Sequence, residues 1–233
     1  MPRSNAEAPC MKVLCVADHV DPLVYSNSIK DRFSDVHLVL AAGDLHLEYY
    51  GFIVSSLNVP LCFVFGNHNL ERIKDYRSEF RNVYSLNPEA FHHYHSYGAT
   101  YVGGKMVKIK GILIAGLGGS MRYNRGDNQF TEIGMFLYAL RLLPRLLWNR
   151  LRYGRFLDIL LTHAPPRNIH DKEDPCHRGF QFFRLFMDIF KPRFLIHGHV
   201  HLYDLNAQRE TMYKRTRVIN AYDHVLLDIE ELE

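Results

Sequence analysis

The sequence predicts an α/β fold, and three observations support this interpretation. Apolar, strand-like runs alternate with helix-like stretches over residues 11–65, which is the βαβαβ pattern of a parallel sheet covered by helices. Glycine-bounded apolar runs over residues 101–115 predict a second sheet that is at least partly antiparallel. Residue types that bind metals repeatedly follow predicted strands, which indicates a site at the carboxyl edge of a sheet.

The composition is that of an ordinary globular protein. The chain has 233 residues, of which 47% are hydrophobic and 23% are charged, enough for one α/β domain with a sizeable core. We therefore expect residues 1–233 to form a single domain, with residues 1–10 as a flexible N-terminal extension. The formal net charge of +3 is too small to indicate a nucleic-acid partner, and no basic stripe with interleaved aromatic residues supports a nuclease.

Cysteine usage indicates a reducing compartment. The four cysteines form no Cys-x-x-Cys pair, and Cys15 and Cys62 lie in predicted buried strands, where we expect them to be small core residues. Residues 1–10 are polar and lack the apolar stretch of a signal peptide, and no run of 18 apolar residues predicts a transmembrane segment. We expect a cytoplasmic protein.

The first third of the chain is predicted to form the parallel sheet. Its strands are predicted from short apolar runs rich in valine and leucine. Ser26 and Ser28 lie near the start of the first predicted helix. In order, the predicted elements are a strand at 11–17, a helix at 24–34, a strand at 36–42, a helix at about 46–57 and a strand at 61–65.

The middle of the chain is expected to build the second sheet. The apolar runs at 101–102 and 106–109 are separated by Gly103-Gly104, and this turn has the appearance of a hairpin. A further strand-like run at 112–115 follows Gly111.

The last part of the chain continues the alternation of helices and strands. A helix opens at Thr131-Glu132 and reaches about residue 150, and Pro144 should kink or split it because proline removes a backbone donor. The runs at 218–221 and 225–229 are expected to form a closing hairpin. Between the helix and this hairpin lie a strand at 157–162, a polar loop at 164–178, a helix at 180–190 and a strand at 193–197.

Five short segments between residues 18 and 201 each place a metal-ligand residue type at the end of a strand-like run. One such ending carries little information, but five in one chain predict a site where the strands end. The carboxylate, imidazole and amide side chains suit divalent manganese, iron or zinc and do not suit a thiolate-type structural site. The segments are Asp18, Gly43-Asp44, Gly66-Asn67-His68, His163 and Gly198-His199-Val200-His201.

The order of these motifs resembles that of the calcineurin-like metallophosphoesterase superfamily. The shared order is Asp, Gly-Asp, Gly-Asn-His, His and Gly-His-x-His, and the resemblance extends from about residue 11 to residue 229. It implies a two-sheet sandwich with helices on both outer faces, a four-layer α-β-β-α arrangement.

The resemblance also implies two divalent metal ions, bridged by Asp44 and held roughly 3.5–4 Å apart. The donor set favours manganese, with iron, zinc or nickel as alternatives. Residues 199 and 201 are i and i+2 of an extended segment, so both imidazoles can reach one metal pair. The matching ligands are Asp18 and His201 for the first metal, and Asn67, His163 and His199 for the second.

His68 matches the family histidine that contacts substrate rather than metal. The resemblance implies hydrolysis of a phosphodiester or phosphomonoester, in which His68 stabilises the phosphoryl charge and protonates the leaving oxygen. The implied nucleophile is a metal-bound hydroxide. The alternative is a non-catalytic metal-binding scaffold or interaction module on the same fold, and the retention of His68 argues against it.

The first motif departs from the family pattern, because Val20 stands where the family has a histidine ligand. His19 is expected to point away from Asp18 on an extended strand end. Three alternatives stay open: Asp21 supplies the missing ligand, His46 supplies it from the neighbouring strand, or water fills the position.

Two loops are candidates for substrate binding. Arg122 lies in the polar, glycine-rich loop 116–128, and an arginine can clamp a phosphate bidentately. His177 and Arg178 follow the predicted ligand His163 in a polar loop that is expected to form a wall of the site. For both loops the alternative is a structural, solvated role.

The apolar, arginine-bearing stretch 133–150 is expected to be mostly core against a sheet. Its other roles could be a lid over a lipid-linked phosphate substrate, a subunit interface that gives a homo-oligomer, or a contact with a membrane surface. The partner that the sequence indicates is a phosphate-ester substrate, and its identity stays open.

Overall fold

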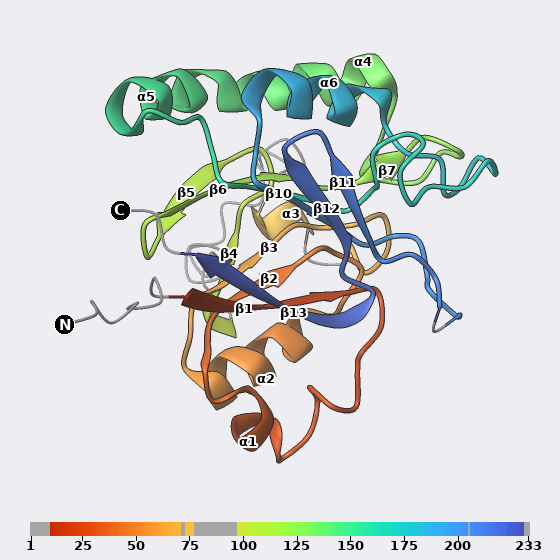
Figure 1. The fold of residues 1–233 in the computed structure, drawn as a ribbon. Coiled ribbons are helices and arrows are strands. Elements are labelled where there is room, and N and C mark those ends of the chain that lie inside the picture. The colour runs from red at the N-terminus through yellow and green to blue at the C-terminus, as the bar shows by residue number, and fades with distance from the viewer. Residues whose placement is uncertain (1–9, 71–72, 77–96, 205, 231–233) are drawn as a thin grey trace.

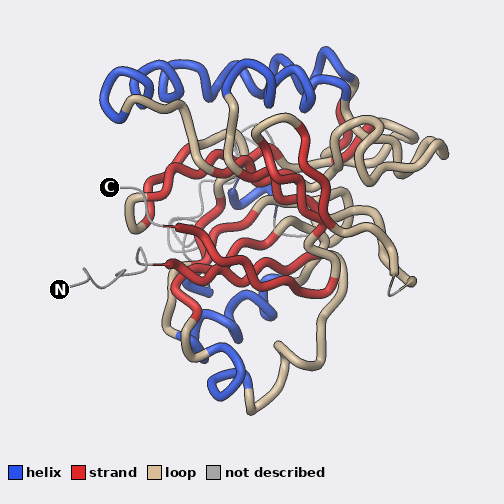
Figure 2. Tube along the Cα trace, viewed as in Figure 1, coloured by secondary structure: helices blue, strands red, loops and turns tan. Residues whose placement is uncertain are grey.

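The fold consists of four layers in the order α-β-β-α (Figure 1, Figure 2). The computed structural model describes residues 10–70, 73–76, 97–204 and 206–230. Two sheets lie face to face, and helices cover the outer face of each, which confirms the predicted α/β sandwich. Of the expected N-terminal extension, residues 1–9 lie outside the described residues, and Cys10 already belongs to the first strand.

The first sheet has five strands in the order β13-β1-β2-β3-β4. β1 to β4 run parallel, and β13 pairs antiparallel with β1 at one edge. The helices α1 (Ile29–Phe33) and α2 (Leu47–Leu57) cover its outer face, and α3 (Ile73–Tyr76) is a short turn of helix. The strands are β1 (Cys10–Ala17), β2 (Val36–Ala41), β3 (Leu61–Phe63), β4 (Ala99–Tyr101) and β13 (Asp223–Glu230).

The second sheet has six strands in the order β11-β12-β10-β9-β6-β5. Its four central strands run parallel, and β11 and β5 pair antiparallel at the two edges. A separate short parallel pair joins β7 (Ser120–Met121) to β8 (Gln129–Phe130). The six strands are β5 (Met106–Ile109), β6 (Ile112–Leu117), β9 (Ile159–Thr162), β10 (Phe194–His197), β11 (Glu210–Tyr213) and β12 (Thr216–Asn220).

The outer layer over the second sheet confirms the predicted helix and its interruption. Thr131 caps α4 (Glu132–Ala139) by accepting a hydrogen bond from the Gly134 N–H at 3.0 Å. A 3-10 turn, η3 (Leu140–Leu142), then leads into α5 (Leu143–Tyr153), which has Pro144 in its first turn, where a missing donor costs nothing. The last helix, α6 (Gln181–Phe190), packs beside α4 in the same layer (Figure 1).

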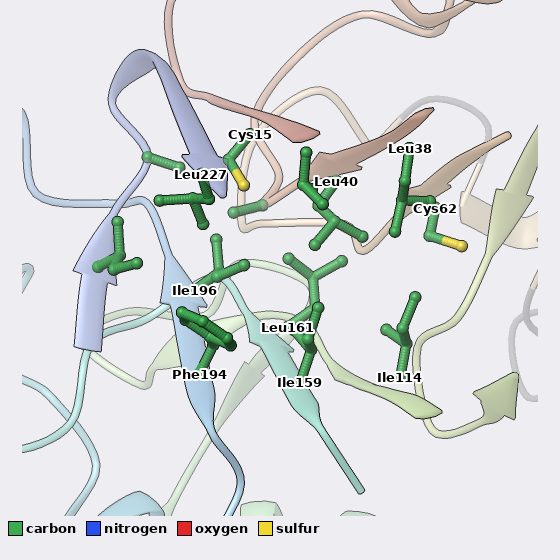
Figure 3. Packing of buried hydrophobic residues seen from close by; sticks show 14 of the residues in the cluster. Cys15, Leu38, Leu40, Cys62, Ile114, Ile159, Leu161, Phe194, Ile196 and Leu227 are labelled. Atoms are coloured by element: carbon green, nitrogen blue, oxygen red, sulfur yellow. The ribbon is translucent and has the colours of Figure 1, made fainter. Parts of the chain in front are cut away.

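Three apolar clusters hold the four layers together. Successive side chains of a strand point to opposite faces, so Cys15 packs between the sheets while Leu14 and Val16 pack under α1 and α2. Figure 3 shows the cluster between the sheets, where Leu40 of β2 lies near Leu161 of β9. The central strands are buried on both faces, so they read as continuous apolar runs rather than as an alternation.

The buried cysteines Cys15 and Cys62 are small core residues, as predicted. Burial raises the pKa of Cys62 to about 12 and that of Cys15 further still, so both thiols stay uncharged. None of the helices in the described part of the chain is long and apolar enough to cross a membrane.

The hairpin predicted at Gly103-Gly104 is wrong. β4 belongs to the first sheet and β5 to the second, so the chain passes between the sheets at these glycines. The hairpin forms one turn later, between β5 and β6, where Lys110 and Gly111 have φ of 47° and 86°. Positive φ at both positions is the type I′ geometry that matches the twist of paired strands.

The closing hairpin predicted from the runs at 218–221 and 225–229 is also wrong. β12 lies in the second sheet, whereas β13 pairs with β1 in the first. The hairpin partner of β12 is the preceding strand, β11. Two consecutive apolar runs do not reveal whether the chain turns back in one sheet or crosses to the other, since that depends on the packing of the whole sandwich.

The helix predicted at 24–34 is shorter than expected and begins at Ile29. The serine hydroxyls before it bond to each other and to Arg32, with the Arg32 guanidinium 2.7 Å from the Ser28 hydroxyl. Such local side-chain bonds compete with the helical backbone pattern.

Candidate metal centre

The predicted ligands lie where parallel strands of both sheets end at one edge. Asp18 follows β1, Asp44 follows β2, and His163 and His199 follow β9 and β10. Asp18, Asp44 and His199 have φ of 65°, 58° and 68°, a left-handed backbone that is costly for residues with a side chain. The chain therefore turns sharply at each of these strand ends.

Asp44, His163 and His199 form a compact group of ligand atoms, all within 4.8 Å of one another. His163 Nε2 lies 3.2 Å from Asp44 Oδ2 and 3.2 Å from Asn67 Oδ1. Two oxygen donors and an imidazole nitrogen thus converge on one point from both sheets.

The two imidazoles are held by their outer nitrogens. His163 Nδ1 lies 2.7 Å from the Ala42 carbonyl, and His199 Nε2 lies 2.6 Å from the Cys176 carbonyl. A carbonyl can only accept, so these nitrogens carry the protons, and His163 Nε2 and His199 Nδ1 are left to bind a metal. Such outer hydrogen bonds set the tautomer and the ring orientation of metal-binding histidines.

The electrostatics of the group favour a bound cation. Burial opposes a charge on His163, but the Asp44 and Asp18 carboxylates raise its pKa to about 9. Burial raises the pKa of Asp18 to about 7, whereas the charge of His163 outweighs burial at Asp44 and lowers its pKa to about 2. Without a metal, a proton on His163 therefore supplies the positive charge that the carboxylates attract, and a divalent cation would displace it.

The imidazoles of the Gly-His-x-His motif are neutral. Burial lowers the pKa of His199 to about 3 and also lowers the pKa of His201. A neutral imidazole is the form that binds a metal. With carboxylate and amide oxygens beside them, these residues fit a borderline divalent metal such as manganese, iron or zinc.

Three motif glycines are required by close approaches within the site. A Cβ on Gly66 would lie 2.0 Å from Asp44 Oδ1, and one on Gly198 would lie 2.5 Å from Asp18 Oδ2. Gly43 has φ of +101°, and its Cβ would lie 2.7 Å from His163 Nδ1. The glycines let the strand ends approach the ligands without a clash.

The ligands expected for the first metal are less compact. Both oxygens of Asp18 accept the His199 backbone N–H, at 3.0 and 2.8 Å, and this links the two sheets. His201 lies outside the close group; its Nδ1 is 2.8 Å from the Tyr203 hydroxyl and its ring packs against Tyr222. The residues expected to hold the second metal therefore lie closer together than those expected to hold the first.

The two candidate replacements for the missing histidine have other environments. Asp21 accepts the Leu23 N–H at 2.7 Å and pairs with His224 Nδ1. His46 is exposed and precedes α2 as its N-cap residue. Val20 is partly buried against the apolar cluster under the first sheet. Neither Asp21 nor His46 belongs to the compact group of ligand atoms in the described part of the chain.

His68 lies at the surface next to the ligand group. Its backbone N–H donates to Asp44 Oδ1 at 2.8 Å, and the residue is exposed to solvent. Asn69, with φ of 53°, donates to the Asp44 carbonyl at 2.9 Å. The loop is therefore tied to Asp44 through its backbone and one amide, which leaves the His68 imidazole open to a ligand from solvent.

The three candidate substrate residues lie in two loops. Arg122 is exposed and its guanidinium donates to the Gln129 carbonyl at 3.3 Å. His177 packs its ring 5.5 Å from the ring of His199, and its Nδ1 lies 2.9 Å from Asp174 Oδ1. Arg178 is exposed, with a long contact to the Glu173 carbonyl. Of the three, His177 lies beside the ligand group.

Sequence reasoning missed three residues that support the site. The first is Tyr123, whose hydroxyl accepts a hydrogen bond from the Asn67 amide at 3.2 Å. Through Tyr123, which is next to Arg122, the glycine-rich loop reaches the site. Asn128 is buried and donates to the Gly66 carbonyl at 2.6 Å. Asn220, at the end of β12, donates to the Val200 carbonyl at 2.7 Å. The strand-end rule could have found Asn220 but not the other two.

Two solved structures share the fold of this chain. A crystal structure with 13% sequence identity aligns with a TM-score of 0.64 over 94% of this chain and 95% of its own. The crystal structure of TT1561 from Thermus thermophilus aligns with a TM-score of 0.57 and 13% identity over 92% of this chain and 90% of its own. No curated protein matches the chain.

At such low identity these structures show a shared fold alone. The family model of the calcineurin-like phosphoesterases matches residues 11–203, which include all five predicted ligand segments. The chain belongs to the calcineurin-like phosphoesterase family.

Proposed function

We propose that this protein is a divalent-metal-dependent hydrolase of a phosphodiester or phosphomonoester. The observation that carries the proposal is the convergence of Asp44 Oδ2, Asn67 Oδ1 and His163 Nε2 beside an exposed histidine, His68. The family match supports the reaction class.

The residues divide into two ligand sets that share Asp44. Asn67, His163 and His199 would hold one cation with it, and Asp18 and His201 would hold the other. Two bound cations would supply a nucleophilic water at neutral pH and neutralise the phosphoryl charge. The fixed imidazoles and the buried carboxylates keep the ligand geometry in place before any metal arrives.

In this proposal, His68 donates a proton to the leaving oxygen. Its N–H bond to Asp44 fixes the backbone beside the shared ligand, while the residue itself faces solvent. An imidazole suits proton transfer near neutral pH. Tyr123 and His177 border the ligand group and are further candidates to contact the substrate.

Activity is expected to depend on added divalent metal and to be highest with manganese. The reason is the oxygen and nitrogen ligand set without thiolate. The protein is stripped with a chelator and then assayed with manganese, iron, nickel, zinc or magnesium on a chromogenic diester and on the matching monoester. Inactivity on both esters with all five metals would favour the non-catalytic scaffold.

The scaffold alternative has one specific observation in its favour. Val20 occupies a ligand position, and neither Asp21 nor His46 takes its place in the described structure. A protein that only binds metal and a partner would tolerate this loss. A scaffold does not require an exposed His68. The effect of substituting His68 on turnover therefore distinguishes an enzyme from a scaffold.

The two metal sites are expected to differ in affinity, and Val20→His should tighten the weaker one. Asp18, Asp44 and His201 give the first metal three protein ligands, whereas the second metal has four. A restored imidazole should improve the first affinity by at least roughly tenfold, which is about 1.4 kcal/mol. Calorimetric titration of the metal-free protein measures both affinities.

Val20→Phe is the matched control for this prediction, since it adds a ring of similar size without a ligating nitrogen. It should leave the first affinity unchanged or weaker. Two equally tight sites in the unmodified protein would mean that another residue already completes the first set of ligands.

A further inference from the structure

The helix α5 carries a second apolar stripe on its solvent side. Leu146 faces the sheet and is buried, as expected of a surface helix. Yet Leu143, Leu147 and Leu151 repeat at i, i+4 and i+8 on another face, and Leu147 and Leu151 are 52% and 84% exposed. Trp148 extends this stripe and is 56% exposed. The side of a surface helix that faces water normally carries polar residues.

The stripe continues onto the neighbouring helices of the same layer. Ile133 and Leu137 are exposed on α4, and Leu185 and Ile189 are exposed on α6. Figure 1 shows these helices together in one layer on the outside of the second sheet. Between them runs a groove lined only by apolar side chains, among which are Phe136, Leu143 and Leu185. We call the surface formed by the exposed apolar residues of α4, α5 and α6 the outer helical face.

Along α5, the charge on the outer helical face is of one sign. Residues 133–153 contain Arg141, Arg145, Arg150 and Arg152 and no aspartate or glutamate, whereas Arg155, just beyond α5, pairs with Asp158 at 2.8 Å. Successive residues of an α-helix are rotated by about 100° around its axis. Arg145 and Arg152 therefore lie on one side of the α5 stripe, and Arg150 lies on the other.

The nearest acids on these helices are already engaged. Glu132 accepts the backbone N–H groups of Gln181 and Phe182, at 2.8 and 3.0 Å. Asp188 of α6 pairs with Lys214 at 2.7 Å. Arg145, Arg150 and Arg152 are exposed, and α5 contains no carboxylate to pair with them. Arg150 also donates to the Gly154 carbonyl.

We propose that the outer helical face docks this protein onto the surface of an anionic lipid bilayer. Leucine and tryptophan flanked by arginines on a helix that lies along the surface is the pattern of interfacial membrane binding. The apolar stripe would enter the boundary between headgroups and acyl chains, and the arginines would meet the lipid phosphates. The inference does not depend on the chemistry at the metal centre.

Charge complementarity favours a bilayer over a second copy of the chain. A twofold interface brings the same surface of both subunits together. It would place these arginines opposite their own copies with no acid in the segment to pair them. An anionic membrane supplies the opposite charge in excess, while it accepts the apolar stripe as well.

Sedimentation of the whole protein with lipid vesicles tests the proposal. We expect binding to vesicles of phosphatidylcholine mixed with phosphatidylglycerol, and much weaker binding to phosphatidylcholine alone. Raising the salt concentration should weaken the binding, because screening reduces attraction between exposed charges.

Two pairs of substitutions separate the apolar and the charged contributions. Arg145→Gln with Arg152→Gln should weaken binding to the anionic vesicles roughly 25-fold, or roughly fivefold for each charge. Leu147→Gln with Leu151→Gln should weaken binding to them at least about tenfold, because both leucines would have to be withdrawn from the lipid. Both pairs change exposed positions, so the unfolding temperature should stay near that of the unmodified protein.

Leu226→Gln and Lys30→Gln are the matched controls, since both residues are exposed on other faces, on β13 and α1. They should leave vesicle binding unchanged. The proposal is overturned if anionic vesicles do not bind the protein, or if the two substituted pairs bind as well as the controls. A third result would also overturn it: the protein does not bind vesicles and forms a dimer, and Leu147→Gln with Leu151→Gln dissociates that dimer.

Discussion

Asp44→Ala is expected to remove both metal ions and to abolish hydrolysis. Asp44 is the carboxylate shared by the two ligand sets, and its Oδ2 lies 3.2 Å from His163 Nε2. Residues that only orient a ligand typically contribute 10–100-fold to metal affinity, so loss of the shared ligand should cost more than about 100-fold at each site. Metal analysis of the purified variant and calorimetric titration measure the loss.

Asp44→Asn separates the charge of this residue from its hydrogen bond. The amide oxygen can still accept the His68 N–H, which Asp44 Oδ1 accepts at 2.8 Å. The substitution removes the charge that raises the pKa of His163, and it replaces the second carboxylate oxygen, which faces His163, with an amide nitrogen that cannot bind a cation. Asp44→Asn should therefore lose metal almost as fully as Asp44→Ala. An alanine variant that keeps two metals would show that Asp44 does not bridge them.

His68→Ala is expected to slow turnover by roughly 10²–10⁴-fold while the metal content stays nearly intact. The contact from residue 68 to Asp44 is made by the backbone N–H, which alanine keeps. The missing group is the imidazole that would protonate the leaving oxygen. Turnover at saturating metal, measured together with metal content, tests this separation of roles.

A series of esters with leaving groups of different pKa provides the internal control for His68→Ala. A leaving group that departs readily as an anion needs no proton, so the defect should shrink as the pKa of the leaving group falls. An equal defect across the series would argue against general acid catalysis. Loss of metal in His68→Ala would instead identify His68 as a ligand.

Local patterns in the sequence were enough to predict the fold class and most of the strands. Because they are buried on both faces, the central strands β1, β2, β9 and β10 read as continuous apolar runs that are easily recognised. Pro144 predicted the break between α4 and α5, since proline suits only the first turn of a helix. The ligand types at the strand ends were equally visible, because each follows directly from a short motif.

Pairing between distant segments could not be predicted in this way. Both predicted hairpins were wrong, because Gly103-Gly104 and Ala221-Tyr222 carry the chain from one sheet to the other. A glycine pair between apolar runs has the same local signature in a hairpin as in such a crossing. The choice depends on which sheet buries the following strand, and this is a property of the assembled sandwich.

The sequence by itself determined the family, most of the strands and the residue types available to a metal. Only the tertiary structure decided which atoms meet. It turned His163 Nε2 toward Asp44 and Asn67, brought Tyr123 against Asn67, and paired Asp21 with His224 rather than placing it among the ligands. The reason is that a side chain's direction depends on backbone turns and packing partners far away in the sequence, whereas its chemical type is local.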